Sequence, residues 1–178
     1  MSDKEIYIVR DLDNLASITQ KIESLDIEYQ CKVLEAKIME SNIYISRKLG
    51  IPLASEVFYI KRLRIVEGIP KSIEKVYLTY DKVKGIETEN LECQSLYLLL
   101  NQLYGYAVRE REEEILIVES NEEERALLQT EDKEVLLIKG RTNMGGENPY
   151  EYFEIVSVTD FYRFRSTSYY DKSLRYLS

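Results

Sequence analysis

Two strand-forming runs joined by a short turn set the strongest limit on the fold. Residues 56–66 are rich in β-branched and aromatic side chains, and a second run of this kind ends near Tyr80. Between the two runs stands Glu67-Gly68-Ile69, and glycine is favoured at hairpin turns. The pattern predicts a β-hairpin, and with it an antiparallel pair of strands.

The length of this turn decides which side chains share a face of the hairpin. A two-residue turn would place Arg62 and Glu74 on opposite faces. A three-residue turn at Glu67-Gly68-Ile69 would instead set Arg62 across from Glu74 and Arg64 across from Ser72. We expect the three-residue turn, which gathers two cations, a carboxylate and a hydroxyl on one surface.

The remaining segments alternate between helical and strand patterns. Helices are expected over 14–25, over 42–49 closed by Gly50, from Ser95 to a C-cap at Gly105, and from an N-cap at Asn121 to about Leu128. Further strands are expected at about 30–39, 107–119, 135–141, 150–158 and 161–167. These elements predict one α+β domain with a mostly antiparallel β-sheet and helices packed on it.

The charge and the composition exclude several classes of function. A net charge of −8 and a pI near 4.8 argue against a nucleic-acid-binding surface in this chain, because phosphate contacts need clustered lysine and arginine. The 178 residues include no histidine, and Cys31 and Cys93 stand far apart, so we expect no catalytic triad, no metal site and no cofactor. The acidic runs 110–114 and 122–124 are typical of solvated surfaces.

No targeting or membrane signal is recognisable in the sequence. The opening residues Met1-Ser2-Asp3-Lys4 lack the pattern of a signal peptide, and no apolar run is long enough to span a bilayer. We therefore expect a cytoplasmic protein without contact to a membrane.

Arg62 and Arg64 are the first candidates for ligand binding. Both lie on the strand face that carries Phe58, Ile60 and Val66, because side chains alternate with a period of two. A guanidinium group on a partly apolar face needs a carboxylate, a phosphate or solvent. The pattern fits a polar ligand site that includes Glu74, and it also fits a solvated or salt-bridged strand face.

Three hydroxyl residues stand near expected helix starts. Ser95 lies where unpaired backbone amides favour an anion, although serine is also a preferred N-cap. Ser17 and Thr19 carry the same ambiguity between anion binding and capping or plain exposure.

Glu151 is the candidate acid of the last long strand. It alternates with Phe153 and Ile155 and so lies on the apolar face, where either a ligand or an arginine would be its partner. Tyr97 and Tyr152 are the tyrosines that we expect near a ligand, since tyrosine combines an apolar body with a polar tip.

Read in order, these segments resemble the UTRA domain of GntR-type transcription regulators of the HutC subfamily. The resemblance runs from about Leu15 to Phe164. It is carried by Arg62-Leu63-Arg64, Gly68-Ile69-Pro70, Glu74, Tyr77 and Leu78, by Ser95-Leu96-Tyr97 through Tyr104-Gly105, by Pro149-Tyr150-Glu151-Tyr152, and by Asp160 to Phe164. The chain departs from the family pattern at Ile18, where an aromatic residue is usual, and at Leu25-Asp26-Ile27, where a glycine is usual.

The resemblance implies a sensor and not an enzyme. It implies a chorismate lyase-like fold that binds a small effector, such as a sugar phosphate or an amino-acid catabolite, and that forms a homodimer. It also implies a winged helix-turn-helix domain as the part that binds DNA. The implied effector contacts are Arg62, Arg64, Glu74, Ser95 and Glu151, with Tyr97 and Tyr152 nearby and the segment Ser17 to Thr19 as an anion-holding loop.

The same resemblance predicts the domain organisation. Residues 1–13 are expected to form a linker or N-terminal strand, and residues 14–170 the effector-binding and dimerisation domain. We expect the winged helix domain to be absent from this chain, so that DNA is a partner only through an N-terminal domain outside it.

Two other functions compete with this interpretation. A lyase related to chorismate lyase would hold a carboxylated substrate with the arginine pair and would release pyruvate from chorismate. A dimerisation module without a ligand would pair Arg62 with Glu74 and leave no open pocket.

Overall fold

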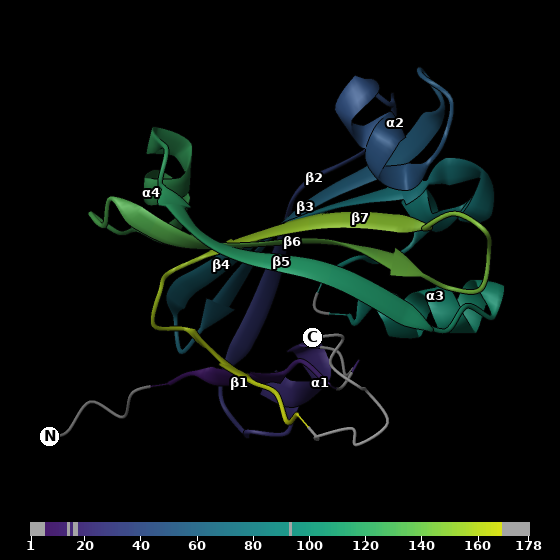
Figure 1. Cartoon of the computed structure of the whole chain (residues 1–178). Coiled ribbons are helices and arrows are strands. Elements are labelled where there is room, and N and C mark those ends of the chain that lie inside the picture. Colours follow the sequence, from purple (N-terminus) through teal and green to yellow (C-terminus); the bar gives the residue numbers. More distant parts are fainter. Residues whose placement is uncertain (1–5, 14, 16–17, 93, 169–178) are drawn as a thin grey trace, which may run out of the picture.

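A six-stranded antiparallel sheet forms the centre of the computed structural model, which describes residues 6–13, 15, 18–92 and 94–168 (Figure 1). Its strand order is β2-β3-β4-β7-β6-β5. The strands are β2 (Tyr29–Glu40), β3 (Glu56–Val66), β4 (Ile69–Thr79), β5 (Glu110–Glu119), β6 (Glu134–Asn143) and β7 (Glu151–Ser157). The α+β class and the mostly antiparallel sheet expected from the sequence are confirmed.

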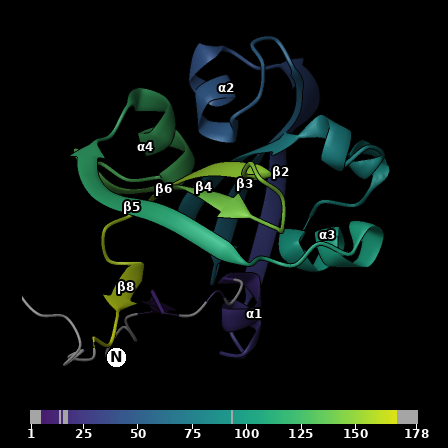
Figure 2. The same cartoon turned by 45° about the vertical axis from the view of Figure 1, so that its right-hand side comes forward.

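Helices cover both faces of this sheet. Helices α1 (Ile18–Glu23) and α3 (Leu96–Tyr104) lie on one face, and α2 (Ile43–Leu49) and α4 (Glu122–Leu128) lie on the other (Figures 1 and 2). Two short 3₁₀ helices, Tyr80–Lys82 and Ile86–Thr88, connect β4 toward α3. The face under α1 and α3 carries the largest core cluster, which includes Phe58, Ile60 and Leu100. Arg62 and Arg64 continue the Phe58 and Ile60 alternation, so they also point to that face.

The β3–β4 hairpin has the predicted pairing but a different turn. Arg62 lies across from Glu74 and Arg64 across from Ser72, as expected. The turn itself contains two residues, Glu67 and Gly68, whose φ angles are 49° and 74°. The register then shifts by one residue between Arg64 and Ile65, so the extra residue lies in a bulge of β4 and not in the turn.

A separate two-stranded ribbon lies beside α1. Strands β1 (Ile8–Asp11) and β8 (Tyr162–Arg165) pair in parallel, with Arg10 next to Phe164 (Figure 1). Ile8 and Tyr162 are buried in the main core cluster. The sequence predicted strands at both ends of the chain but gave no sign that they pair with each other.

Caps define most helix boundaries. Ser95 and Asn121 accept a hydrogen bond from the backbone N–H three residues on, and Gly105 ends α3 with φ 70°, as predicted. The first helix is shorter than the expected 14–25, since it ends at Glu23 and leaves Leu25 49% exposed. Asp26 has φ 52°, so it adopts the left-handed conformation that glycine favours. The strand expected from residue 107 begins at Glu110.

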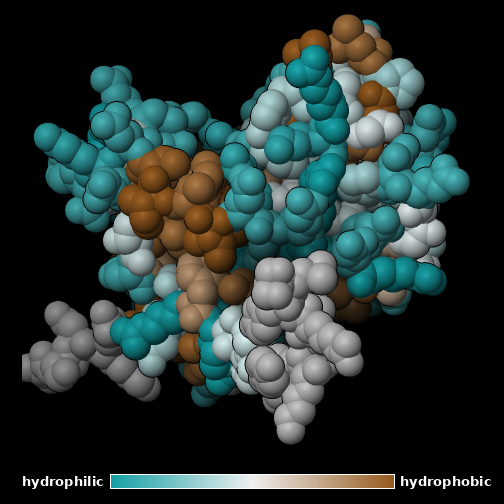
Figure 3. Space-filling view, viewed as in Figure 1, coloured by the Kyte–Doolittle hydropathy of each residue, from teal (hydrophilic) through white to brown (hydrophobic). Residues whose placement is uncertain are grey.

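The edge strand β5 carries an apolar surface. Leu116 and Ile117 are 39% and 55% exposed, and Figure 3 shows apolar side chains gathered below α4 where β5 passes. Acidic residues at 110, 112–114 and 119 flank this segment on the same strand. Charged residues on an edge strand oppose uncontrolled pairing with other chains, so β5 is protected in this way.

The described residues show neither a membrane-spanning helix nor a metal cluster. None of their helices is both long and apolar enough to cross a bilayer. Among them, no group of three or more His, Cys, Asp or Glu side chains could hold a metal ion.

Candidate functional site

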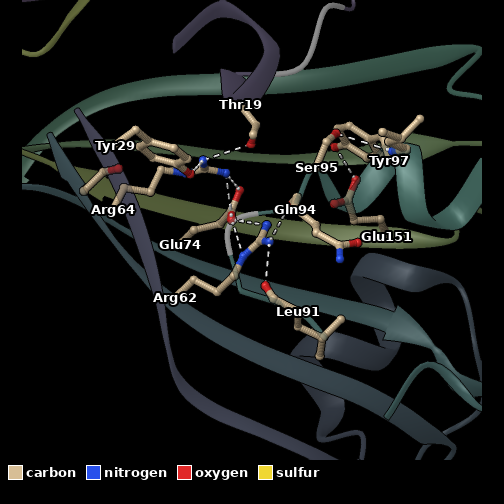
Figure 4. A network of polar contacts seen from close by, with 12 residues as sticks. Thr19, Tyr29, Arg62, Arg64, Glu74, Leu91, Gln94, Ser95, Tyr97 and Glu151 are labelled. Carbon is tan, nitrogen blue, oxygen red and sulfur yellow. Dashed lines mark hydrogen bonds and ion pairs between the residues drawn. The ribbon is translucent and has the colours of Figure 1, made fainter. Parts of the chain in front are cut away.

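A small cavity between the six-stranded sheet and helices α1 and α3 collects most of the predicted site residues (Figure 4). Its volume is about 40 Å³. Four arginines and two glutamates contribute to its wall, together with apolar and hydroxyl side chains. The lining residues are Arg10, Thr19, Arg62, Arg64, Glu74, Leu96, Tyr97, Arg111, Glu151, Phe153 and Ile155.

Glu74 bridges the two arginines of β3, as Figure 4 shows. Arg62 donates to Glu74 Oε2 from Nε at 2.9 Å and from Nη2 at 2.5 Å, while Arg64 Nη2 lies 3.1 Å from the same oxygen. Arg62 Nη1 also donates to the backbone carbonyl of Gln94 at 3.2 Å. Arg62 and Arg64 are only 2% and 3% exposed, so these contacts replace nearly all of their hydration.

The two guanidinium groups determine the ionisation of Glu74. Burial alone would raise the pKa of this carboxyl group, but the charges and hydrogen bonds of Arg62 and Arg64 outweigh burial and lower the pKa to about 2. Glu74 is therefore a carboxylate at neutral pH, and it neutralises one of the two cations.

A second polar cluster surrounds Glu151 of β7. Tyr97 of α3 donates a hydrogen bond to Glu151 Oε2 at 2.7 Å, and its hydroxyl lies 3.5 Å from Thr142 Oγ1. Burial raises the pKa of Glu151, and the hydrogen bonds from Thr142 and Tyr97 only partly oppose this effect. Burial, followed by the nearby charge of Glu151, also raises the pKa of Tyr97. The tyrosine hydroxyl therefore stays protonated and is a hydrogen-bond donor.

The Tyr97→Phe variant is expected to lose stability increasingly as the pH rises. The folded pKa of Glu151 is already above its ordinary value of 4.5, so Glu151 favours the folded state at low pH, and this contribution is lost as the pH rises through the folded pKa. Removing the donor raises the folded pKa further. Denaturant unfolding between pH 4.5 and 8 should show a growing difference from the wild-type chain; a difference that stays constant with pH would contradict this coupling.

The structure adds two arginines that the sequence analysis did not select. Arg10 of β1 is 6% exposed and donates from Nη2 to Glu113 Oε2 at 2.7 Å. Arg111 of β5 lies over the rings of Tyr97 and Phe153, at 5.3 and 5.9 Å from their centroids. Arg111 forms no ion pair with any residue that the structure describes. Alternation with Ile115, which packs against the main core cluster, is a signal that could have placed Arg111 and Glu113 on the core face.

The prediction that the acidic run 110–114 is a solvated surface is wrong for Glu113. Its side chain is 14% exposed because it pairs with the buried Arg10. Glu112 and Glu114 point to the opposite face, are 71% and 66% exposed, and pair there with Arg141 and Lys139. The solvated half of the run is thus the half that points away from the cavity.

Three arginines at the cavity retain polar atoms without a partner. Arg10 Nη1, Arg64 Nε and Arg111 Nε are buried and have no hydrogen-bond partner among the described residues. Buried guanidinium nitrogens of this kind are costly unless an acceptor is bound. All three unpartnered nitrogens belong to side chains that line the same cavity.

The other predicted site residues lie at different distances from the cavity. Thr19 lines it and accepts a hydrogen bond from Arg64 Nη1 at 3.2 Å. Ser95 caps α3 and lines a neighbouring pocket of about 280 Å³ that shares Tyr97 with the cavity. Ser17 lies outside the described residues.

Tyr152 is not brought to the cavity. It follows Glu151 along β7, so its side chain points to the opposite face of the sheet. There its hydroxyl lies 2.6 Å from that of Tyr44 and donates to Glu154 at 2.8 Å. Tyr152 therefore lies apart from the cavity that holds most of the predicted site residues, and its nearness to a ligand stays a prediction.

A ligand-free dimerisation module predicts that Arg62 pairs with Glu74 and that no open pocket remains. The two side chains do pair, at 2.5 Å. A cavity with unpartnered guanidinium nitrogens nevertheless lies next to them. The combination fits a ligand-binding site better than a sealed module.

Comparison with known proteins places this arrangement in a family. The sequence model of the UTRA domain family matches residues 24–163 of this chain. A transcriptional repressor of the helix-turn-helix type from Salmonella typhimurium, STM4068, is 25% identical over 148 residues, which are 82% of this chain and 60% of that protein. The transcriptional regulator GmuR of Bacillus subtilis is 27% identical over 97 residues, which are 54% of this chain and 39% of that protein. Both relatives are named as regulators and not as enzymes.

The fold matches solved structures as well. The effector domain of PhnF from Mycobacterium smegmatis superimposes with a TM-score of 0.82 at 16% identity, covering 92% of this chain and all of that domain. The chain spans less than two thirds of the length of the two curated relatives. Its α+β architecture is the chorismate lyase-like fold. The chain belongs to the UTRA domain family, the ligand-binding domains of GntR-type transcription regulators of the HutC subfamily.

Proposed function

We propose that this chain binds a small anionic metabolite, a sugar phosphate or a carboxylate, in the arginine-lined cavity. The observation that carries the proposal is the charge of the site. Four guanidinium groups stand against three carboxyl groups, those of Glu74, Glu151 and the Arg10 partner Glu113. This leaves one positive charge in excess when Glu151 is ionised and two when it is protonated, and a bound anion would compensate them.

The size of the cavity limits the part of the ligand that it holds. One water molecule needs roughly 10–15 Å³ of such a volume. The cavity of about 40 Å³ therefore suits a phosphate or carboxylate head group and not a whole sugar. We propose that the body of the ligand extends past Tyr97 into the neighbouring pocket of about 280 Å³, where Ser95 lies.

The ligand is proposed to regulate the DNA binding of an attached winged helix domain. The relatives STM4068 and GmuR are named as transcription regulators, and the matched part of PhnF is named as its effector domain, which supports such a role here. A homodimer in the bacterial cytoplasm would let the ligand change the spacing of two DNA-binding domains. This requires that the ligand binds one arrangement of the dimer more tightly than the other.

Ligand binding is expected to raise the melting temperature of the chain, and the Arg64→Ala change is expected to reduce this effect. A ligand that binds only the folded state stabilises it, by about 2.7 kcal/mol at one hundred times its dissociation constant. A thermal-shift screen against sugar phosphates, amino-acid catabolites and small carboxylates measures the effect. Arg64→Ala should weaken binding of the active compound at least about tenfold, the worth of a hydrogen bond to a charged group.

Two further variants make this screen decisive. Arg64→Lys keeps the charge but loses the forked geometry, so it tests the site if the alanine variant does not fold. Arg141→Ala removes an arginine from the opposite face of the sheet, where it pairs with Glu112, and should leave the shift intact. An equal loss in Arg141→Ala, or a full shift in both Arg64 variants, would contradict the proposed site.

A further inference from the structure

The β1–β8 ribbon is joined to the rest of the fold through side chains. Among the described residues it forms no strand ladder with the six-stranded sheet. Arg10 reaches Glu113 of β5, the Tyr162 hydroxyl lies 3.5 Å from Ser72 Oγ of β4, and Lys21 of α1 donates to the carbonyl of Val9 at 3.0 Å. The ion pair of Arg10 is thus a charged tether between the ribbon and the main sheet.

Arg10 belongs to the ribbon and to the cavity at once. Its guanidinium carbon lies 5.7 Å from the centroid of the Tyr162 ring, within the ribbon. The same side chain lines the cavity beside Arg62 and Arg64. One of its terminal nitrogens holds Glu113, and the other, Nη1, is buried without a partner in the described part of the chain.

We infer that Arg10 binds the anionic group of the ligand directly, and that an oxyanion in the cavity thereby fixes the β1–β8 ribbon against the six-stranded sheet. The inference rests on the proposed function of the cavity. It adds a binding residue that neither the sequence nor the family match supplied, and it identifies the structural element that responds to the ligand.

The physical reason is the balance of charges around Arg10. Without an anion, Arg10 has one carboxylate partner, and the cavity contains three further guanidinium groups against the two carboxyl groups of Glu74 and Glu151. The excess of positive charge opposes the docked position of β1. An oxyanion between Arg10 and Arg64 removes this excess and supplies the missing acceptor.

The coupling between the ligand and the β1–β8 ribbon would extend to an attached DNA-binding domain. The family resemblance implies a winged helix domain that precedes β1, so the ribbon would be the joint between that domain and the ligand site. A ligand that fixes this joint selects among the positions of the attached domain, and its differential contact is the one with Arg10.

Hydrogen exchange of the whole chain tests the inference, with inorganic phosphate and glucose 6-phosphate as two separate probes. In the wild-type chain a saturating probe should slow exchange of the β1 and β8 amides, by up to about 100-fold at one hundred times the dissociation constant. Arg10→Gln should weaken binding at least about tenfold and abolish this protection. Arg165→Gln, which breaks the exposed pair with Asp11 in the same ribbon, should retain both.

A change at Glu113 gives a readout in the opposite direction. Glu113→Gln removes the carboxylate that competes for Arg10, so phosphate should bind more tightly, whereas a purely structural role of the pair predicts weaker binding. In an Arg10→Gln background the same change should have much less effect. This pair of variants tests the inference even if Arg10→Gln alone is poorly folded.

The outcomes separate the inference from the proposed function. Protection by both probes assigns recognition to the head group, and protection by glucose 6-phosphate alone assigns it to a phosphate ester; either result supports the inference. Equal affinity of the wild-type chain and Arg10→Gln, or binding without protection of the ribbon, overturns the inference but leaves the proposed function in place. Failure of these probes and of the whole ligand screen to bind the wild-type chain overturns both.

Discussion

Replacing Glu74 with alanine is expected to destabilise the fold by about 3–5 kcal/mol, the usual cost of removing one partner from a buried ion pair. Glu74 is the shared acceptor of Arg62 and Arg64, whose side chains are 2% and 4% exposed. Without it both guanidinium groups stay buried and repel each other across a cavity that already holds an excess of positive charge. Equilibrium unfolding in denaturant at pH 7 measures the loss.

The lowered pKa of Glu74 also makes the stability of the wild-type chain depend on pH. The folded pKa of Glu74, about 2, is below its ordinary value of 4.5, so the carboxylate contributes stability above about pH 4.5 and loses it as the pH falls toward 2. A shift of this size corresponds to about 3 kcal/mol. The difference between the wild-type chain and Glu74→Ala should therefore shrink as the pH is lowered from 4.5.

An exposed glutamate serves as the control for Glu74. Glu114→Ala removes the partner of Lys139, a pair whose carboxylate is 66% exposed, and should change stability far less than Glu74→Ala does, because solvent screens exposed ion pairs. Similar losses in the two variants, or a Glu74→Ala loss that does not change with pH, would show that the buried cluster does not have the assigned role.

The Gly140→Ala variant is expected to lose about 3 kcal/mol, the upper end of the cost of overpacking a core. A Cβ atom at this position of β6 would clash with the carbonyl oxygen of Glu112 and would lie 2.8 Å from the Phe153 ring. The carbonyl belongs to the neighbouring strand and cannot rotate away. Phe153 would also be displaced from the cavity wall, so anion binding should weaken together with stability.

Thermal unfolding and ligand titration of Gly140→Ala measure the two effects. Gly146→Ala is the matched control, because a Cβ there meets only the end of the Tyr150 side chain, which can move. Its stability and ligand affinity should stay close to those of the wild-type chain. A tolerated alanine at Gly140 would mean that β5 and β6 can separate without cost, contrary to their continuous pairing.

The hairpin shows how far the periodicity of the sequence determines the site. Alternation predicts Arg62, Arg64 and Glu74 on one face if one extra residue lies between the two strands. The predicted pairing of Arg62 with Glu74 is confirmed. The pattern could not show that the extra residue sits in a bulge of β4, because a bulge and a longer turn shift the register equally. The sequence thus predicts the face on which these side chains lie, but it does not predict the position of the bulge in β4.

Arg10 and Arg111 show the opposite case. β1 has four residues, too few for a periodic pattern, and its partner β8 lies at the other end of the chain. Arg111 stands in a run of glutamates, where the abundance of charge hid the alternation that turns it inward. The position of Arg10 depends on contacts between distant segments, which local sequence patterns do not encode.

The pairing of β1 with β8 also fixes the order in which the site can be completed during synthesis. Asp11 and Arg165 are 154 positions apart, so the ribbon closes one of the longest loops that the chain can form. Closing such a loop is unfavourable until the intervening sheet is built, and a growing chain exposes β8 only after the rest of this domain has been synthesised. Arg10 can therefore reach its position at the cavity only after nearly the whole domain has folded, and a nascent chain that lacks β8 has an incomplete ligand site.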